Sequence, residues 1–226
     1  MSPSFADLGV PADLVALLSG AGIDQPFPIQ TAALPDALAG RDVCGRAPTG
    51  SGKTLAFGIA AVEALAKLGN ATSRRPNGLV LVPTRELAAQ VCQAIDPLAR
   101  ARRLRVAAIY GGTGYGPQLR ALGSGVDMLV ACPGRLEDLI ERGDVDLSKV
   151  RLVVVDEADR MADMGFLPAV RRILDLSSSE RQVLLFSATL DGEVDCSCAV
   201  TSTTPRATRS RPKRATTGTC SITSGR

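Results

Sequence analysis

The sequence has no histidine among its 226 residues. This absence excludes Ser-His-Asp and Cys-His nucleophile systems, zinc sites with imidazole ligands, and any acid–base step carried out by an imidazole. Any chemistry must therefore depend on carboxylates, lysine, arginine, hydroxyls, backbone amides or a bound metal ion.

Long apolar runs are also absent, because no segment approaches the ~18 consecutive apolar residues that span a membrane. The first seven residues lack the basic region and apolar stretch of a signal peptide. The six cysteines show no Cys-x-x-Cys pairing of the kind that binds zinc. We therefore expect no membrane partner, a cytoplasmic location and free thiols. With 45% hydrophobic and 22% charged residues, the composition favours a globular chain with a sizeable core.

Acidic residues are absent after Asp195. Residues 196–226 contain six basic and thirteen Ser or Thr residues, so the formal charge is +6 for this segment and −3 for residues 1–195. This composition cannot bury enough apolar surface to offset the entropy lost on ordering the chain. We expect residues 1–195 to form the folded domain and residues 196–226 to be a disordered, basic, Ser/Thr-rich tail.

Short apolar runs alternate with helix-length segments from Asp42 onward. The predicted strands are 42–47, 78–83, 104–110, 127–131, 150–155 and 182–187. The predicted helices between them are 53–68, 85–100, 117–122, 133–142 and 166–176, and two short helices, 11–18 and 29–39, precede the first strand. Because buried parallel strands are apolar on both faces, this alternation predicts an α/β fold, with a parallel sheet and helices on both of its faces. Ligands of such folds bind at the carboxyl ends of the strands.

A glycine-rich segment links the first predicted strand to the next helix. Gly50 and Gly52 allow backbone angles at which successive amides converge on phosphate oxygens, and the free N–H groups of the helix start add to this. Lys53 would supply a positive charge for the phosphates and Thr54 a hydroxyl ligand for Mg²⁺. Ala47 stands where the general P-loop pattern has glycine, and the alternative is an ordinary glycine-rich turn. The candidate nucleotide-binding residues are Ala47, Thr49, Gly50, Ser51, Gly52, Lys53 and Thr54.

Three carboxylates follow the predicted strand 150–155, at Asp156, Glu157 and Asp159. Adjacent acids at the end of a buried strand repel each other unless a cation or water accommodates them. Asp156 is the candidate Mg²⁺ partner, and Glu157 is the candidate for orienting or deprotonating an attacking water. The alternative is an acidic pair that complements the dipole of a helix start.

These motifs together resemble the DEAD-box ATP-dependent RNA helicases. The tetrapeptide Asp156-Glu157-Ala158-Asp159 is the sequence after which that family is named. The other motifs stand in the family's order, at Phe5, 26–30, 47–54, 83–87, 111–112, 133–135 and 187–189. The resemblance covers about residues 5–195 and implies the first of the family's two RecA-like P-loop NTPase domains, with residues 1–40 as its Q-motif segment.

The resemblance implies ATP and Mg²⁺ as cofactors, with Lys53, Asp156 and Glu157 as catalytic residues and Thr54 and Asp156 as metal partners. It also implies that the Gln30 amide recognises the adenine edge, since an amide can both donate and accept. From the residues alone, Gln30 is equally a helix-starting glutamine. Two positions depart from the family: Ile23 replaces an aromatic and Phe27 replaces Thr. These departures predict either a weaker adenine preference or a pocket repacked around Phe27.

RNA is the partner that the resemblance implies, bound through its backbone with little sequence preference and strong salt dependence. Cys132 stands where the family has Thr, so one hydroxyl contact is missing. From the residues alone, Thr84 is a helix cap and the two adjacent glycines are a turn. Ser187 and Thr189 would couple the acidic motif to RNA through hydrogen bonds to Asp159. The implied RNA-binding residues are Pro83, Thr84, Arg85, Gly111, Gly112, Pro133, Gly134 and Arg135.

Complete enzymes of this family have a second RecA-like domain, whose arginines reach the γ-phosphate and which closes on the first. We find no such domain in these 226 residues and expect this chain alone to bind ATP weakly, hydrolyse it poorly and not unwind RNA. The sequence leaves the family register after Asp195, which favours a reading-frame shift or truncation. The alternative is a basic arm that binds RNA electrostatically. Two other functions remain open: a non-catalytic RNA- and nucleotide-binding module, and an inactive truncated fragment.

Overall fold

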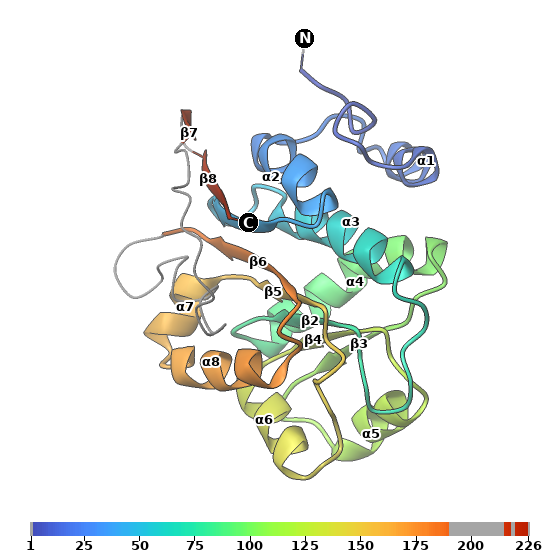
Figure 1. Cartoon of the computed structure of the whole chain (residues 1–226), viewed down its shortest axis with the longest axis vertical. Coiled ribbons are helices and arrows are strands. Elements are labelled where there is room, and N and C mark those ends of the chain that lie inside the picture. Colours follow the sequence, from blue (N-terminus) through green and yellow to red (C-terminus); the bar gives the residue numbers. More distant parts are fainter. Residues whose placement is uncertain (1, 190–214, 218–219, 226) are drawn as a thin grey trace.

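The computed structural model describes residues 2–189 and the backbone of residues 215–217 and 220–225 (Figure 1). Six of the described strands pair in parallel, in the order β3-β4-β2-β5-β6-β1. All six coincide with predicted strands, and the predicted α/β fold is confirmed. Their bounds are β1 (Asp42–Arg46), β2 (Gly78–Leu81), β3 (Val106–Ile109), β4 (Met128–Ala131), β5 (Leu152–Val155) and β6 (Gln182–Ser187).

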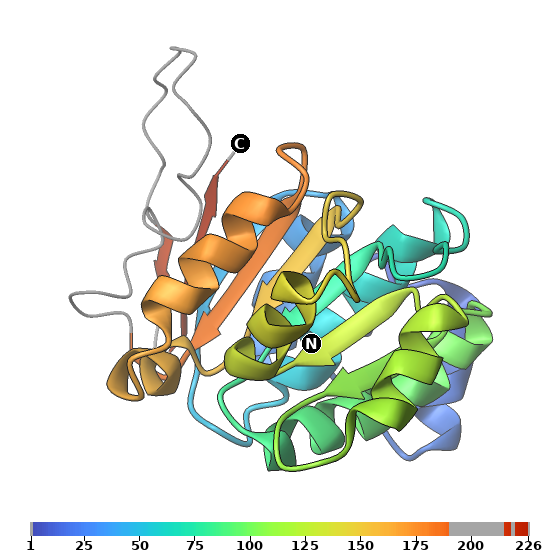
Figure 2. The ribbon, with the colours of Figure 1, turned by 90° about the horizontal axis from the view of Figure 1, so that it is seen from below.

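Helices cover both faces of this sheet (Figures 1 and 2). On one side lie α1 (Ala12–Gly20), α2 (Pro28–Leu38), α3 (Lys53–Ala66) and α4 (Arg85–Ala101). On the other side lie α5 (Tyr115–Gly123), α6 (Pro133–Glu141), α7 (Ala158–Asp163) and α8 (Leu167–Leu176). The pleat divides the strand side chains between two cores, so Val80 belongs to the first core while Leu79 and Leu81 belong to the second.

Local signals explain where several helices begin. The hydroxyl of Thr84 accepts a hydrogen bond from the Leu87 N–H at 3.3 Å, which caps α4. Pro133 occupies the first turn of α6, where its missing N–H costs nothing. The sequence did not predict α7, which is only six residues long and follows Glu157 in the left-handed region (φ 53°). A segment this short has too little apolar periodicity to be recognised.

Two short strands belong to the tail. β8 (Cys220–Gly225) pairs antiparallel with β1, and β7 (Ala215–Thr217) pairs antiparallel with β8, so both extend the sheet beyond β1 (Figure 2). For these nine residues the structure differs from the expected disorder. The physical reason is that β1 is otherwise an edge strand, whose free N–H and C=O groups favour pairing with almost any extended segment. The other tail residues lie outside the described part of the chain.

Two further expectations concern thiols and membranes. Cys92 and Cys132 are free, but Cys44 is disulfide-bonded, so the expectation of free thiols is wrong at that position. Among the described residues, none of the helices has the combination of length and apolar character needed to cross a bilayer.

The strand register brings the ends of all six parallel strands to one edge. Leu81 near the end of β2 stands opposite both Ala131 of β4 and Val155 of β5, and Ala131 also stands opposite Ile109 of β3. Likewise Arg46 at the end of β1 stands opposite Ser187 at the end of β6. The residues that follow each strand therefore meet at one carboxyl edge of the sheet.

Candidate functional site

Nearly all the site residues that the sequence predicted lie at the carboxyl edge of the sheet. In the order of the strands, it presents the glycines after β3, Pro133 after β4, Thr84 after β2, Asp156 after β5, Ser187 at the end of β6 and the glycine-rich loop after β1. Gln30 is the exception, because it comes from α2. We call the ends of β5, β6 and β1 the first half of the edge and the ends of β3, β4 and β2 the second half.

The glycine-rich loop after β1 has the backbone that the sequence predicted. Gly50 and Gly52 have φ values of 82° and 85°, which only glycine adopts without strain. Lys53 is 6% exposed, and its side chain folds back so that Nζ donates to the Ala47 carbonyl at 2.8 Å. The Ala47 N–H in turn donates to the Ser187 carbonyl at 2.9 Å, which ties the loop to β6. The loop is thus held by a hydrogen bond from its own lysine and by a hydrogen bond to the neighbouring strand β6.

Gln30 joins α2 to this loop. Its Nε2 donates to the Gly52 carbonyl at 2.9 Å, and its Oε1 accepts from the Phe27 N–H at 2.8 Å. A Cβ on Gly52 would lie 2.5 Å from Gln30 Nε2 and 2.6 Å from the Phe27 ring, so Gly52 is also required by this close approach. Gln30 is therefore a helix-start residue, as one interpretation of the sequence held, and it also contacts the loop, which the sequence did not predict. Its recognition of adenine stays a prediction.

An apolar groove of about 440 Å³ opens beside the loop. Ile23, which is 37% exposed, and Phe27, which is 55% exposed, line it together with Gly52 and Thr54. Leu98 of α4 also lines the groove. The exposed aromatic ring of Phe27 beside the glycine-rich loop provides a flat apolar surface of the kind on which a base can stack.

Asp156 is the buried acid of the first half, with only 2% of the residue exposed. Burial raises its pKa to about 6, while the nearby Lys53 ammonium and the Glu157 N–H, which donates to Oδ1 at 3.0 Å, act in the opposite direction. The electrostatic interaction with Lys53 brings the glycine-rich loop and the acidic motif together, as the sequence required. Glu157 adopts its left-handed conformation at this point and pairs with Arg160 at 3.3 Å.

Asp159 is hydrogen-bonded to the end of β6. Its N–H donates to Ser187 Oγ at 3.2 Å, and its Oδ2 accepts from the Thr189 N–H at 3.1 Å and the Thr189 hydroxyl at 3.2 Å. Partial burial raises the pKa of Asp159, but the bonds from Arg160, Ser187 and Thr189 outweigh it, and the pKa is lowered. The hydrogen bonds that the resemblance implied between these residues are therefore present.

A divalent cation fits the oxygens of the first half only with help from a ligand. Within the described residues, no group of three or more acidic, cysteine or histidine side chains could hold a metal ion by itself. Mg²⁺, however, usually binds through one or two protein oxygens together with waters and substrate phosphates. The Asp156 carboxylate and the Thr54 hydroxyl have the chemistry for that arrangement, and a cation would relieve the cost of the buried carboxylate.

The second half of the edge is more open. Arg85, with 62% of its side chain exposed, begins α4 and pairs with Glu86 at 2.5 Å. Its guanidinium lies close to Gly112, since a Cβ on that glycine would be 3.4 Å from Nη1. Gly111 and Gly112 are exposed, and Gly112 has a φ of 78°. The structure thus brings Arg85 and the two glycines together.

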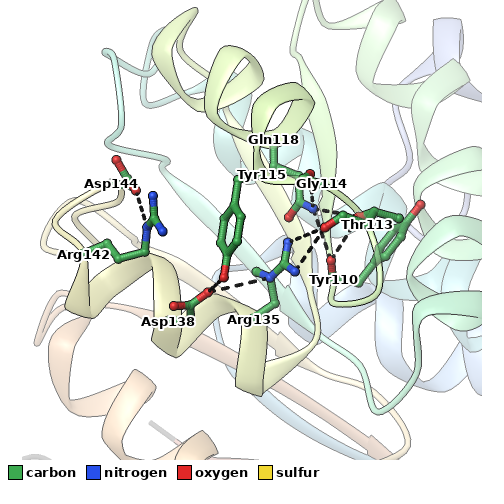
Figure 3. Close-up of polar contacts among 9 residues, drawn as sticks. All are labelled: Tyr110, Thr113, Gly114, Tyr115, Gln118, Arg135, Asp138, Arg142 and Asp144. Atoms are coloured by element: carbon green, nitrogen blue, oxygen red, sulfur yellow. Dashed lines mark hydrogen bonds and ion pairs between the residues drawn. The ribbon is translucent and has the colours of Figure 1, made fainter.

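Arg135 lies differently from Arg85, with only 11% of its side chain exposed. Both of its terminal nitrogens donate to the Thr113 carbonyl at 3.2 Å, and the guanidinium stacks on the Tyr115 ring (Figure 3). Cys132, at the start of α6, makes no side-chain cap. Burial raises the pKa of Cys132 to about 11, so the thiol stays protonated at neutral pH. The replacement of Thr by Cys therefore removes a polar group from this position.

Sequence reasoning missed two residues of the second half, Tyr115 and Gln118. The Tyr115 hydroxyl donates to Asp138 of α6. Gln118 Nε2 donates to the hydroxyl oxygen of Thr113, the residue after the two glycines, at 2.9 Å. The only signal was their place just after a glycine-rich turn. It is too common a pattern to indicate a role, and the predicted helix began at residue 117 rather than at Tyr115.

The fold and this edge define a class of protein: a RecA-like P-loop domain, with a glycine-rich loop after β1 and an acidic motif after the central strand β5. The family comparison is more specific, because the DEAD/DEAH box helicase description matches residues 27–196. The chain belongs to the DEAD/DEAH box helicase family.

Individual relatives agree with this assignment. The chain is 46% identical over 189 residues to DEAD-box ATP-dependent RNA helicase 9, mitochondrial, of Arabidopsis thaliana, covering 83% of this chain and 31% of that protein. It is also 46% identical over 189 residues to DEAD-box ATP-dependent RNA helicase 5 of Oryza sativa subsp. japonica, covering 82% and 36%. The chain thus spans about a third of the length of these curated relatives.

A solved structure shows the same fold. A DEAD box protein from the hyperthermophile Methanococcus jannaschii superposes with a TM-score of 0.74 at 34% identity. The match covers 83% of this chain and 50% of that one.

Proposed function

We propose that this chain is the ATP- and RNA-binding first domain of a DEAD-box RNA helicase, in which ATP hydrolysis drives unwinding of RNA duplexes in the complete two-domain enzyme. The observation that supports the proposal most directly is the meeting of Lys53 and Asp156. They come from motifs about one hundred residues apart in the sequence, yet they interact at one edge of the sheet. Each motif provides a part of a site for a magnesium nucleotide.

The first half of the edge would bind ATP. The amides of the glycine-rich loop and the start of α3 would surround the phosphates, and Lys53 would exchange the Ala47 carbonyl for a phosphate oxygen. Thr54 and Asp156 would hold Mg²⁺, which neutralises charge on the phosphates. Glu157, which lies beside Asp156 and pairs with the exposed Arg160, would orient or deprotonate the attacking water.

The base would lie in the apolar groove beside the loop. Gln30 uses one hydrogen of Nε2 on Gly52 and one lone pair of Oε1 on Phe27, which leaves one donor and one acceptor position for an adenine edge. Phe27, with its ring exposed in the same groove, would supply the stacking surface that Ile23 cannot.

The second half of the edge would bind the RNA backbone. Arg85 and the starts of α4 and α6 offer a guanidinium and free N–H groups, which recognise phosphates without reading bases. By the family resemblance, Asp159, Ser187 and Thr189 would couple the acidic motif to RNA binding. Their hydrogen bonds connect this motif to the end of β6 within the first half of the edge. A cytoplasmic location stays a prediction.

Calorimetric titration tests the proposal. The 226-residue chain is titrated with ATP·Mg²⁺ in the presence and absence of single-stranded RNA, and with RNA alone at two salt concentrations. We expect weak but saturable ATP binding that needs Mg²⁺, and RNA binding that weakens steeply with salt. RNA binding without nucleotide binding would favour a non-catalytic RNA module. Failure to bind either ligand, together with the absence of a cooperative thermal transition, would favour an inactive fragment.

A further inference from the structure

In the loop between β3 and α5, residues 110–114, oxygens accept hydrogen bonds from the protein, whereas the backbone N–H groups of residues 111–114 do not donate to its described part. Within the described residues, no protein group accepts a hydrogen bond from the N–H of Gly111, Gly112, Thr113 or Gly114. All four residues are exposed. Successive unpaired amides in an exposed turn form a binding surface for an anion such as a phosphate.

The acceptors of the same loop are held by two side chains from outside it. Gln118 Nε2 donates to the Tyr110 carbonyl at 3.1 Å and to the Thr113 hydroxyl at 2.9 Å (Figure 3). The Arg135 guanidinium donates twice to the Thr113 carbonyl. Because Gln118 Nε2 and the Arg135 guanidinium both donate to oxygens of the loop, they fix which side of the loop turns toward the protein, and the amides are left for another ligand.

Arg135 is itself held in this position from several directions. The Tyr115 ring lies between two guanidiniums, with the central carbon of Arg135 at 4.3 Å and that of Arg142 at 4.4 Å from the ring centroid (Figure 3). Asp138 accepts from the Tyr115 hydroxyl and pairs with Arg135 Nε at 3.8 Å. A guanidinium that is 11% exposed and so fully engaged has little freedom to reach a phosphate in solution.

We propose that Arg135, assisted by Gln118, is a positioning residue for RNA binding: it holds the acceptors of loop 110–114 inward and thereby leaves the loop amides free to bind an RNA phosphate. The inference rests on the proposed RNA-binding function and assigns Arg135 a role different from direct contact. Arg85, which is exposed beside Gly112, keeps the role of a phosphate contact.

Fluorescence anisotropy with a labelled uridine decamer separates positioning from contact. We expect Arg135→Ala to weaken binding by about tenfold, since a charge-assisted pair of hydrogen bonds is lost. Arg142→Ala is the matched control, because it removes the same charge and a contact with the same ring but no bond to the loop. It should change binding less than twofold. Arg135→Lys should resemble Arg135→Ala, because lysine keeps the charge but not the two-pronged contact.

The salt dependence gives the second readout. A phosphate contact on a single strand contributes about 0.7 to the slope of log K against log salt. Arg85→Ala should reduce the slope by that amount, whereas Arg135→Ala should leave the slope of the wild type unchanged. In amide NMR spectra, RNA should shift the signals of Gly111 and Gly112 in the wild type and in Arg142→Ala, but not in Arg135→Ala. The Arg85 signal should still respond in Arg135→Ala, which excludes general unfolding.

Three outcomes would overturn the inference. A reduced salt slope in Arg135→Ala, restored by Arg135→Lys, would make Arg135 a direct phosphate contact. Equal affinities of Arg135→Ala and Arg142→Ala would show that the loop does not depend on Arg135. Wild-type protein that binds RNA without any response of the Gly111 and Gly112 amides would show that the loop is not a binding surface. Absence of RNA binding by the wild type is a different result, because it contradicts the proposed function itself.

Discussion

The two halves of the carboxyl edge differ in the burial and pairing of their main phosphate-binding candidates. In the first half two opposite charges are buried near each other: Lys53 donates to the Ala47 carbonyl, and Asp156, which is 2% exposed, interacts electrostatically with Lys53. In the second half Arg85 is exposed, and the amides of the loop after β3 have no hydrogen-bond acceptor in the described part of the chain. Both halves are built from the same element, a loop after a parallel strand.

The difference follows from what each half is proposed to bind. A site for phosphate chemistry gains from buried charges, because a low dielectric strengthens each interaction at the reacting atoms. A surface for a nucleic-acid backbone gains from exposed donors, because its ligand is a repeating anion that stays partly in water. The comparison teaches that the sheet edge is specialised by burial rather than by residue type alone.

The largest effect that separates the halves is expected at Lys53. Lys53→Ala should lower the affinity for ATP·Mg²⁺ by on the order of a hundredfold, because a buried charge is lost and Asp156 loses its partner. RNA affinity should be unchanged. Lys67→Ala, an exposed lysine at the end of the same helix, is the control. Calorimetry measures both ligands, and an equal loss of RNA affinity would mean that the halves are not independent.

The pH dependence of Asp156 gives a second test of the buried half. Its pKa is raised from 3.8 to about 6 in the folded chain, so the folded state binds the proton more tightly than the unfolded state. The folded state is therefore favoured most at low pH. This contribution is lost as the pH rises from about 4 to 6, by up to about 3 kcal/mol.

Asp156→Asn removes this titration and provides the reference. The difference in melting temperature between the variant and the wild type should grow as the pH rises from 4 to 6 and then level off, with the variant the more stable. Mg²⁺-dependent ATP binding by the wild type should weaken below pH 6 by about tenfold per pH unit, since the metal needs the carboxylate. A difference in melting temperature that does not vary with pH would contradict the assignment.

The glycines of the first half allow a sharper test of close packing. Gly50 and Gly52 both have positive φ values, but a Cβ on Gly50 meets nothing within 4 Å, whereas one on Gly52 meets Gln30 and Phe27. Gly50→Ala should cost about 1 kcal/mol of unfolding free energy, from backbone strain alone. Gly52→Ala should cost about 2 kcal/mol more, because the contacts with α2 must also open. Thermal melts of the two variants measure the difference, and equal melting temperatures would show that Gln30 does not anchor the loop.

The smallest effect is expected at the hydrogen bonds of Asp159, which are proposed to couple ATP binding to RNA binding. Thr189→Val removes the hydroxyl bond to Asp159 but keeps the backbone N–H bond, so ATP and RNA should each bind alone with wild-type affinity. The ratio of RNA affinities with and without ATP·Mg²⁺ should fall about two- to threefold. Thr189→Ser keeps the hydroxyl and should keep the ratio. An unchanged ratio in Thr189→Val would remove this bond from the proposed coupling.

Much of the fold was predictable because its signals are local. Four of the six parallel strands, β2, β4, β5 and β6, are fully buried, and most of the six are short apolar runs. A capping residue such as Thr84 marks its own helix start within three residues. Helix α7 escaped prediction because six residues show too little apolar periodicity, and because no local preference of glutamate indicates the left-handed conformation of Glu157 that precedes it. The pairing of β8 with β1 escaped prediction because it depends on a free sheet edge, not on the composition of the tail.

The sequence by itself determined the class of site, because the spacing of Gly50, Gly52, Lys53 and the run of acids at Asp156 specify which groups follow which strand. Only the tertiary structure decided what those groups face. It buried Asp156 and Lys53 together, engaged Gln30 with Gly52, and turned Arg135 inward while leaving Arg85 in water. The reason is that residue order limits which strand ends can be neighbours, whereas burial and hydrogen-bond partners depend on contacts between segments far apart in the chain.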